Sequence, residues 1–129
     1  MGSTWEPIER VDVKVKGVDP DDTSFLVVEV TLSATPPGEW PHRFENPVGV
    51  EVPTSMRPPK VERSVVRFRV ADDQLEEYVR TLDQRIAAAN AYYEDDVLPA
   101  RRAAEQRKLD EASMRDQRIA DAQRRVDAL

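Results

Sequence analysis

The first half of the chain alternates apolar and polar residues with the period of a β-strand. Residues 11–16 read Val-Asp-Val-Lys-Val-Lys, so every second side chain is apolar. Because successive side chains of a strand point to opposite faces, this segment is expected to form a half-buried strand. The sequence Gly-Val-Asp-Pro-Asp-Asp at 17–22 then supplies residues that favour a turn.

A second strand is expected at residues 25–32, with apolar side chains on both faces. One face carries Leu26, Val28, Val30 and Leu32, and the other carries Phe25, Val27, Glu29 and Thr31. This pattern is typical of a central strand that is buried fully on one face and partly on the other. Two further strands are expected at 48–52 and at 61–70, and their half-polar alternation favours an antiparallel sheet with one covered face.

A helical pattern replaces the strand pattern after residue 72. Asp73 and Glu76 have the spacing of a capping box, which marks the start of a helix. Apolar residues then recur every three or four positions, at Leu75, Val79, Leu82, Ile86, Ala89 and Tyr93. The favoured interpretation is that this stripe covers the open face of the sheet, because four strands need a covering layer. The alternative is a coiled-coil seam with a second copy.

The predicted fold is therefore α+β, a four-stranded antiparallel sheet covered by a long C-terminal helix that is kinked or broken near Pro99. Proline lacks an N–H donor and crowds the carbonyl of Asp95, so an unbroken straight helix is not expected. The helix could restart with Asp96 as N-cap, or kink and continue. No Gly or Asn lies where a tight reversal would use one. The expected division is residues 1–98, sheet and packing helix, and residues 99–129, a charged helical extension.

The extension is expected to project from the sheet, and either to pair with a second copy or another protein or to fray towards Leu129. Its apolar residues are sparse, and an isolated helix of this kind is marginal in water. We expect the partner-binding residues to be Leu109, Ala112, Ile119, Ala122 and Val126.

Charge separates the two predicted parts. The chain has a net charge of −6; residues 1–99 carry 11 Lys/Arg and 19 Asp/Glu, whereas residues 100–129 carry 8 and 6. An acidic body disfavours broad nucleic-acid binding, which needs concentrated positive charge. An alternative nucleic-acid contact would use Arg101, Lys108, Arg115 and Arg118. Glu111 interrupts that side and no aromatic residue follows Tyr93, so a mixed-charge interhelical surface is favoured.

The loop around residues 36–47 holds the chain's single histidine. Trp40 and Phe44 are expected to plug one end of the sheet; the next interpretation is an exposed binding loop of Trp40, His42 and Phe44. An acid–base group of His42 and Glu45 is the least favoured interpretation, since no nucleophile elbow and no second histidine accompany it. The acidic run at 94–96 is expected to be a solvated helix end rather than a cation site, because consecutive helical carboxylates diverge.

The remaining composition narrows the class of function. The chain has no cysteine, no apolar run of about 20 residues, and no basic segment followed by an apolar stretch at its start. We therefore expect a cytoplasmic protein without a membrane partner, cofactor or metal site. The sequence predicts a non-enzymatic interaction or assembly module that uses its C-terminal helix to form a homo-oligomer or to bind another protein; the alternative is a nucleic-acid-associated accessory protein.

Overall fold

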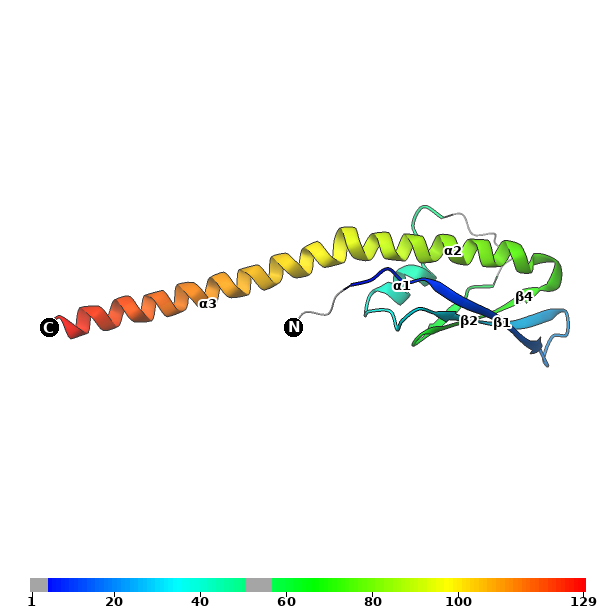
Figure 1. Ribbon diagram of the computed structural model, residues 1–129, viewed down its shortest axis with the longest axis horizontal. Helices are drawn as coiled ribbons and strands as arrows, with labels where there is room; N and C mark the ends of the chain where they lie inside the picture. The colour runs from blue at the N-terminus through cyan, green and yellow to red at the C-terminus, as the bar shows by residue number, and fades with distance from the viewer. Residues whose placement is uncertain (1–4, 51–56) are drawn as a thin grey trace. The chain divides into compact units, whose positions relative to one another are not determined.

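The computed structural model describes residues 5–50 and 57–129 and confirms the α+β class (Figure 1). The elements are β1 (Arg10–Val18), β2 (Phe25–Leu32), α1 (Trp40–Glu45), β3 (Lys60–Glu62), β4 (Val65–Ala71), the 3₁₀ turn η1 (Asp72–Gln74), α2 (Leu75–Tyr92), the π-helical turn η2 (Tyr93–Val97) and α3 (Leu98–Asp127). By contact density the chain divides into a body that ends at Tyr93 and a second unit that begins at Glu94.

The body is built on an antiparallel sheet with strand order β1-β2-β4-β3. The register pairs Val28 with Phe68 and Val30 with Val66, so these four side chains share one face. All four are buried, and Figure 1 shows α2 running along this face. The prediction that residues 25–32 form a central strand is confirmed; of the face expected to be fully buried, Val28, Val30 and Leu32 are buried and Leu26 is half-buried.

The strand predicted at 48–52 is wrong at the described residues, 48–50. Val48, Gly49 and Val50 are not in a strand, and residues 51 and 52 lie outside the described residues. The missing strand comes from the segment predicted as one strand at 61–70, which folds as the hairpin β3–β4. Its two-residue turn has Arg63 at φ 55°, a conformation that usually selects Gly, Asn or Asp.

Strand β1 is more exposed than its alternation predicted. Its pairing with β2 shifts register between Arg10 and Asp12 and again between Val15 and Gly17. Val11 and Val15 are 65% and 47% exposed, and only Val13 is half-buried. The strand lies at the sheet edge, where the register shifts disturb the regular alternation.

Helix α2 covers the sheet as the favoured interpretation predicted. Leu82, Ile86 and Ala89 are buried along it, while Leu75 and Val79 are half-buried. The buried face is wider than the predicted stripe, because Tyr78, Thr81 and Arg85 are buried as well. Tyr78 stacks on Phe68 of β4 with ring centroids 4.1 Å apart, which ties the helix to the sheet.

The capping box expected at the start of the helix is absent, whereas the helix continues past Pro99, as one of the two expected outcomes has it. Within the described chain neither η1 nor α2 has a side-chain cap hydrogen bond, so Asp73 and Glu76 form no capping box. The backbone stays helical through η2, and Val97 rather than Asp96 precedes α3. Pro99 lies in the first turn of α3, where its missing N–H costs no hydrogen bond within that helix.

Candidate functional site

Helix α3 carries more exposed large apolar side chains than any other described helix or strand. It runs for 30 residues, and none of them is buried. Four large apolar side chains on it are 61% to 71% exposed: Leu109, Met114, Ile119 and Val126. An amphipathic helix gains most of its stability from packing its apolar face, and no residue of α3 is buried.

The residues predicted to bind a partner gather on one side of α3. We call Leu109, Ala112, Ile119, Ala122 and Val126 the apolar seam. Each residue advances about 100° around a helix, so Ala112, Ile119 and Val126, seven residues apart, lie almost in line. Leu109 and Ala122 lie on either flank of that line. Met114 points to the opposite side of the helix.

The predicted nucleic-acid contact falls on the same side. Arg101, Lys108, Arg115 and Arg118 are all exposed on α3. Arg101, Lys108 and Arg115, again seven residues apart, run directly beside the apolar seam. The two predicted surfaces therefore overlap, and a helix bound along the seam would cover the cations.

Short-range polar contacts between side chains support α3 along its length. Gln106 donates a hydrogen bond to Asp110 at 2.9 Å, Gln123 donates one to Asp127 at 2.8 Å, and Arg124 pairs with Asp121. All are spaced three or four residues apart and exposed, so each stabilises the helix by about 0.2–0.5 kcal/mol. They support the helix without using its apolar seam.

The loop predicted as a second contact surface is largely internal. Trp40 and Phe44 are both 0% exposed, and their rings stack 5.3 Å apart. His42, between them on α1, is exposed. A partner could reach only His42 of these three residues on the folded surface, because α1 holds the two aromatic residues against the body.

Two polar residues of α2 hold α1 and the N-terminal segment, and the sequence pattern did not reveal them. Asn90 accepts hydrogen bonds from the Trp40 indole (2.8 Å) and the Ile8 amide (3.1 Å), and donates one to the Ile8 carbonyl (2.9 Å). Arg85 donates from Nη1 to the carbonyls of Phe44 and Glu45, both at 3.0 Å. Burial lowers the pKa of Arg85, and the charges of Tyr78 and Glu45 partly oppose that effect. Both residues are structural anchors.

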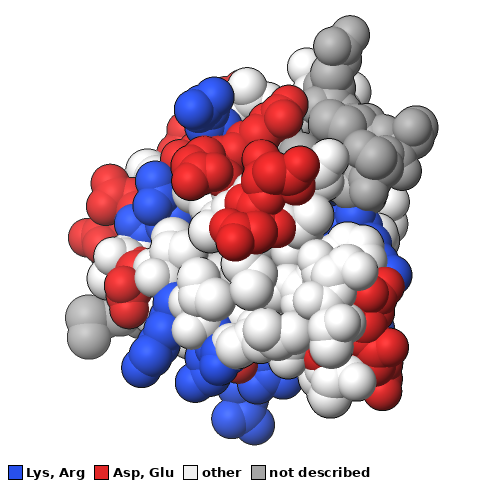
Figure 2. Space-filling model, turned by 90° about the vertical axis from the view of Figure 1, so that its right-hand side faces the viewer, with Lys and Arg blue, Asp and Glu red and all other residues white. Residues whose placement is uncertain are grey.

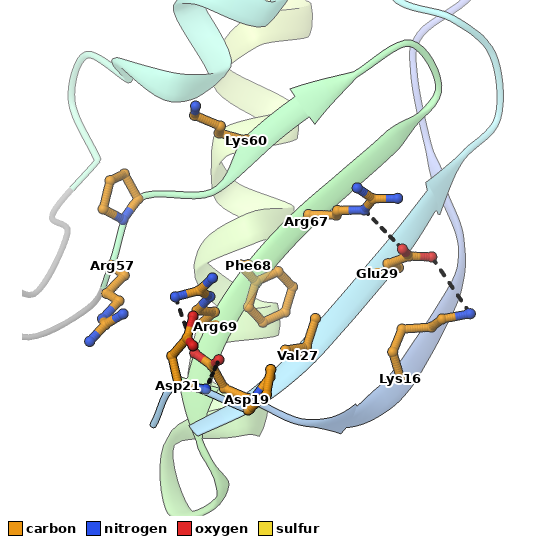
Figure 3. A pocket seen from close by; sticks show the side chains of 12 residues that line it. Lys16, Asp19, Asp21, Val27, Glu29, Arg57, Lys60, Arg67, Phe68 and Arg69 are labelled. Atoms are coloured by element: carbon orange, nitrogen blue, oxygen red, sulfur yellow. Dashed lines mark hydrogen bonds and ion pairs between the residues drawn. The ribbon is translucent and has the colours of Figure 1, made fainter. Parts of the chain in front are cut away.

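A cavity of about 630 Å³ is lined by residues of the sheet and of the adjoining turns (Figure 3). Its apolar lining includes Val27 and Phe68, although the Phe68 ring also stacks on Tyr78 of α2. Charged side chains surround these two: Lys16, Asp19, Asp21, Glu29, Arg57, Lys60, Arg67 and Arg69.

Most of the charge around this cavity is paired internally. Arg67 lies 2.9 Å from Glu29, which also faces Lys16 at 4.0 Å. Asp19 is 1% exposed; its Oδ2 lies 3.1 Å from Nη1 of Arg69, and its Oδ1 accepts a hydrogen bond from the Asp21 amide. Arg57 stacks over the Phe25 ring at 4.4 Å. The cavity brings together ion pairs and apolar surface, but among its lining residues there is no nucleophile–base pair.

The acidic residues do not converge on a cation site. Among the described residues, no group of three or more Asp, Glu, His or Cys is placed to hold a metal ion. Glu94, Asp95 and Asp96 are all exposed. The first turns of η1 and α2 supply four more exposed carboxylates, Asp72, Asp73, Glu76 and Glu77. Figure 2 views the molecule from the right-hand side of Figure 1. It shows acidic side chains gathered in the upper part of this view and basic ones along its lower edge.

In the part of the chain that the structure describes, no helix is both long and apolar enough to cross a bilayer. Comparison with protein-family models, with curated proteins and with solved structures finds no match.

Proposed function

We propose that this chain is a non-enzymatic protein-interaction module in which the apolar seam of α3 binds another helix, either from a second copy or from another protein. The observation that carries the proposal is the exposure of apolar residues on α3. None of its 30 residues is buried, and Leu109, Ile119 and Val126 are exposed on one side. Removing such side chains from water favours association by about 25 cal/mol per Å² of apolar surface.

Charge on the helix supports a protein partner over nucleic acid. Arg101, Lys108 and Arg115 border the seam on one side, while Glu105 and Asp116 lie between Ala112 and Leu109 around the helix. Such a mixture of charges is typical of helix pairs, in which charged residues in and beside the seam select the partner. A nucleic-acid surface would instead need cations without interleaved carboxylates.

The test compares two matched substitutions in the full chain. Ile119→Glu places a carboxylate in the seam, and Met114→Glu places the same group on the opposite side of α3. Sedimentation equilibrium over a concentration series measures self-association. Hydrogen exchange of residues 100–129 at low and high concentration shows whether α3 is the protected element.

The expected result is association of the wild-type chain that Ile119→Glu abolishes and Met114→Glu preserves. If self-association is absent, the chain can still bind a different protein through the seam. Recovery of that protein by the wild type and by Met114→Glu, but not by Ile119→Glu, would identify the seam as its binding surface. A strictly monomeric chain with rapid exchange throughout 100–129 and no seam-dependent partner contradicts the proposal. Binding to DNA or RNA at low salt that Arg101→Glu and Lys108→Glu remove would favour the nucleic-acid alternative.

A further inference from the structure

The charged residues that lie among the apolar residues of α3 distinguish between the possible ways in which two copies of α3 could pair. With Leu109 and Ala112 taken as core positions of a seven-residue repeat, the core positions of α3 are Arg102, Glu105, Leu109, Ala112, Asp116, Ile119, Gln123 and Val126. All of them lie on α3, none of whose side chains is buried. Four of these eight core residues are polar, so their placement decides the geometry.

A parallel pair would bring like charges together. In a parallel two-stranded coil, each core residue faces its own copy. Arg102 would face Arg102, Glu105 would face Glu105, and Asp116 would face Asp116. Three core layers would then hold two like charges each, and removing such charges from water without an opposite partner is costly.

An antiparallel pair avoids these contacts. If the two helices cross near residue 114, the numbers of two core residues that face each other add up to about 228. Leu109 then meets Ile119 of the second copy, Asp116 meets Ala112, Glu105 meets Gln123, and Arg102 meets Val126, each twice by symmetry. At both ends Arg102 also comes within reach of Asp127 of the second copy. The one like-charge contact is Arg115 with its own copy, at the solvent-exposed rim.

Other antiparallel registers match less well. A shift of one heptad in one direction places Asp116 opposite Glu105. A shift in the other direction shortens the overlap and places the larger Ile119, instead of Ala112, opposite Asp116. We propose that the partner of α3 is a second copy of this chain, bound antiparallel with Leu109 of one copy against Ile119 of the other. This inference rests on the proposed function and specifies its geometry.

The absence of cysteine from the chain makes cysteine cross-linking a direct test. Full-length Leu109→Cys and Ile119→Cys are each expressed with a different nitrogen isotope, mixed, and oxidised in glutathione buffer. Disulfide-linked species are quantified by mass spectrometry. The antiparallel pair predicts that the mixed 109–119 disulfide dominates, because two copies of residue 109 lie about 15 Å apart along the axis whereas a disulfide needs Cα atoms within about 7 Å.

The other outcomes overturn the inference in distinguishable ways. Dominant 109–109 and 119–119 disulfides would show a parallel pair, and a dominant 109–126 disulfide with Val126→Cys would show a shifted register; both leave the proposed function standing. A wild-type dimer whose cysteine variants do not cross-link would place the contact elsewhere. A wild-type monomer at all concentrations overturns this inference, and the proposed function falls with it unless a seam-dependent partner is recovered. Met114→Cys is the control and should not cross-link.

A charge exchange checks the same geometry without cysteine. Arg102→Glu should weaken dimerisation by about two- to thirtyfold, because the dimer contains this exposed ion pair twice. Adding Asp127→Arg in the same chain should restore it, since opposite charges would again face each other at these two positions. Arg124→Glu, on the opposite side of α3, is the matched control. Failure of the double substitution to restore dimerisation counts against the antiparallel register.

Discussion

Helices α2 and α3 follow one another in the chain, but they differ in what holds them in place. Six of the 18 residues of α2 are buried, whereas none of the 30 residues of α3 is. Large apolar residues in α2 recur within one turn of each other, while Leu109, Ile119 and Val126 are ten and seven residues apart. The dense pattern anchors a helix to its own sheet, and the sparse pattern leaves a helix dependent on local pairs or on a partner.

Matched truncations of one leucine in each helix should give the largest difference. Leu82 is 0% exposed and Leu109 is 64% exposed. Leu82→Ala should lower the free energy of unfolding of the body by about 2–5 kcal/mol because it leaves a cavity. Leu109→Ala should change it by less than about 0.5 kcal/mol at low protein concentration. Urea unfolding followed by tryptophan fluorescence measures both, since Trp5 and Trp40 lie in the body; equal losses would contradict the division.

A smaller effect is expected from the buried arginine that holds α1 to α2. Arg85→Met keeps much of the side-chain volume but leaves the carbonyls of Phe44 and Glu45 without their donor. The expected loss is about 1–3 kcal/mol, the cost of leaving buried acceptors unpaired. Arg80→Met, at an exposed position of the same helix, is the control and should stay within about 0.5 kcal/mol. If the two variants unfold alike, Arg85 does not anchor α1.

The pH dependence of the free energy of unfolding should report the burial of Tyr78 in the body. Burial raises the pKa of Tyr78 to about 12, although the charge of Arg85 partly opposes this. In the unfolded chain the phenol ionises near pH 10, so stability from Tyr78 is complete below pH 10 and is lost as the pH rises towards 12.

The comparison of wild type with Tyr78→Phe isolates this contribution from other groups that titrate in alkali. The wild-type free energy of unfolding should fall more steeply between pH 10 and 12 than that of Tyr78→Phe. An absorbance titration at 295 nm should also lose its latest tyrosine step in this variant. Parallel pH profiles would show that Tyr78 ionises normally.

The smallest effect is expected at the surface of the body. Arg10 of β1 forms two contacts with Asp83 of α2, at 2.8 Å and 3.0 Å, and both side chains are partly exposed. Asp83→Asn should lower the free energy of unfolding by only about 0.2–1 kcal/mol, and added salt should reduce the difference. A loss as large as that of Leu82→Ala would mean that the pair, rather than burial, fixes β1 beside α2.

Much of the body could be predicted because hydrophobic periodicity reports burial directly. The alternation at 25–32 identified the central strand, and the spacing from Leu75 to Tyr93 identified the covering helix. Signals that depend on tertiary structure were missed. The β3–β4 turn uses Arg63 and Ser64, which carry no Gly or Asn signal, and Arg85 and Asn90 look like surface residues until α1 and the N-terminal segment supply their partners.

The candidate site was predictable only as a list of residues. The spacing of Leu109, Ala112, Ile119 and Val126 places them on one side of a helix, and the structure gives their exposure. Trp40 and Phe44 show the reverse case, because an aromatic pair in a proline-rich loop is compatible with both a binding surface and a core. Only the packing of α1 decides between them.

The irregular edge strand affects how copies of this protein can meet. If residues 10–18 formed a straight, regular edge strand, they would offer a continuous ladder of amide and carbonyl groups to a neighbouring sheet. The register shifts beside Arg10 and Val15 interrupt that ladder at two points. Edge-to-edge pairing of strands into open-ended aggregates is thereby discouraged, even though three valines on this strand face solvent.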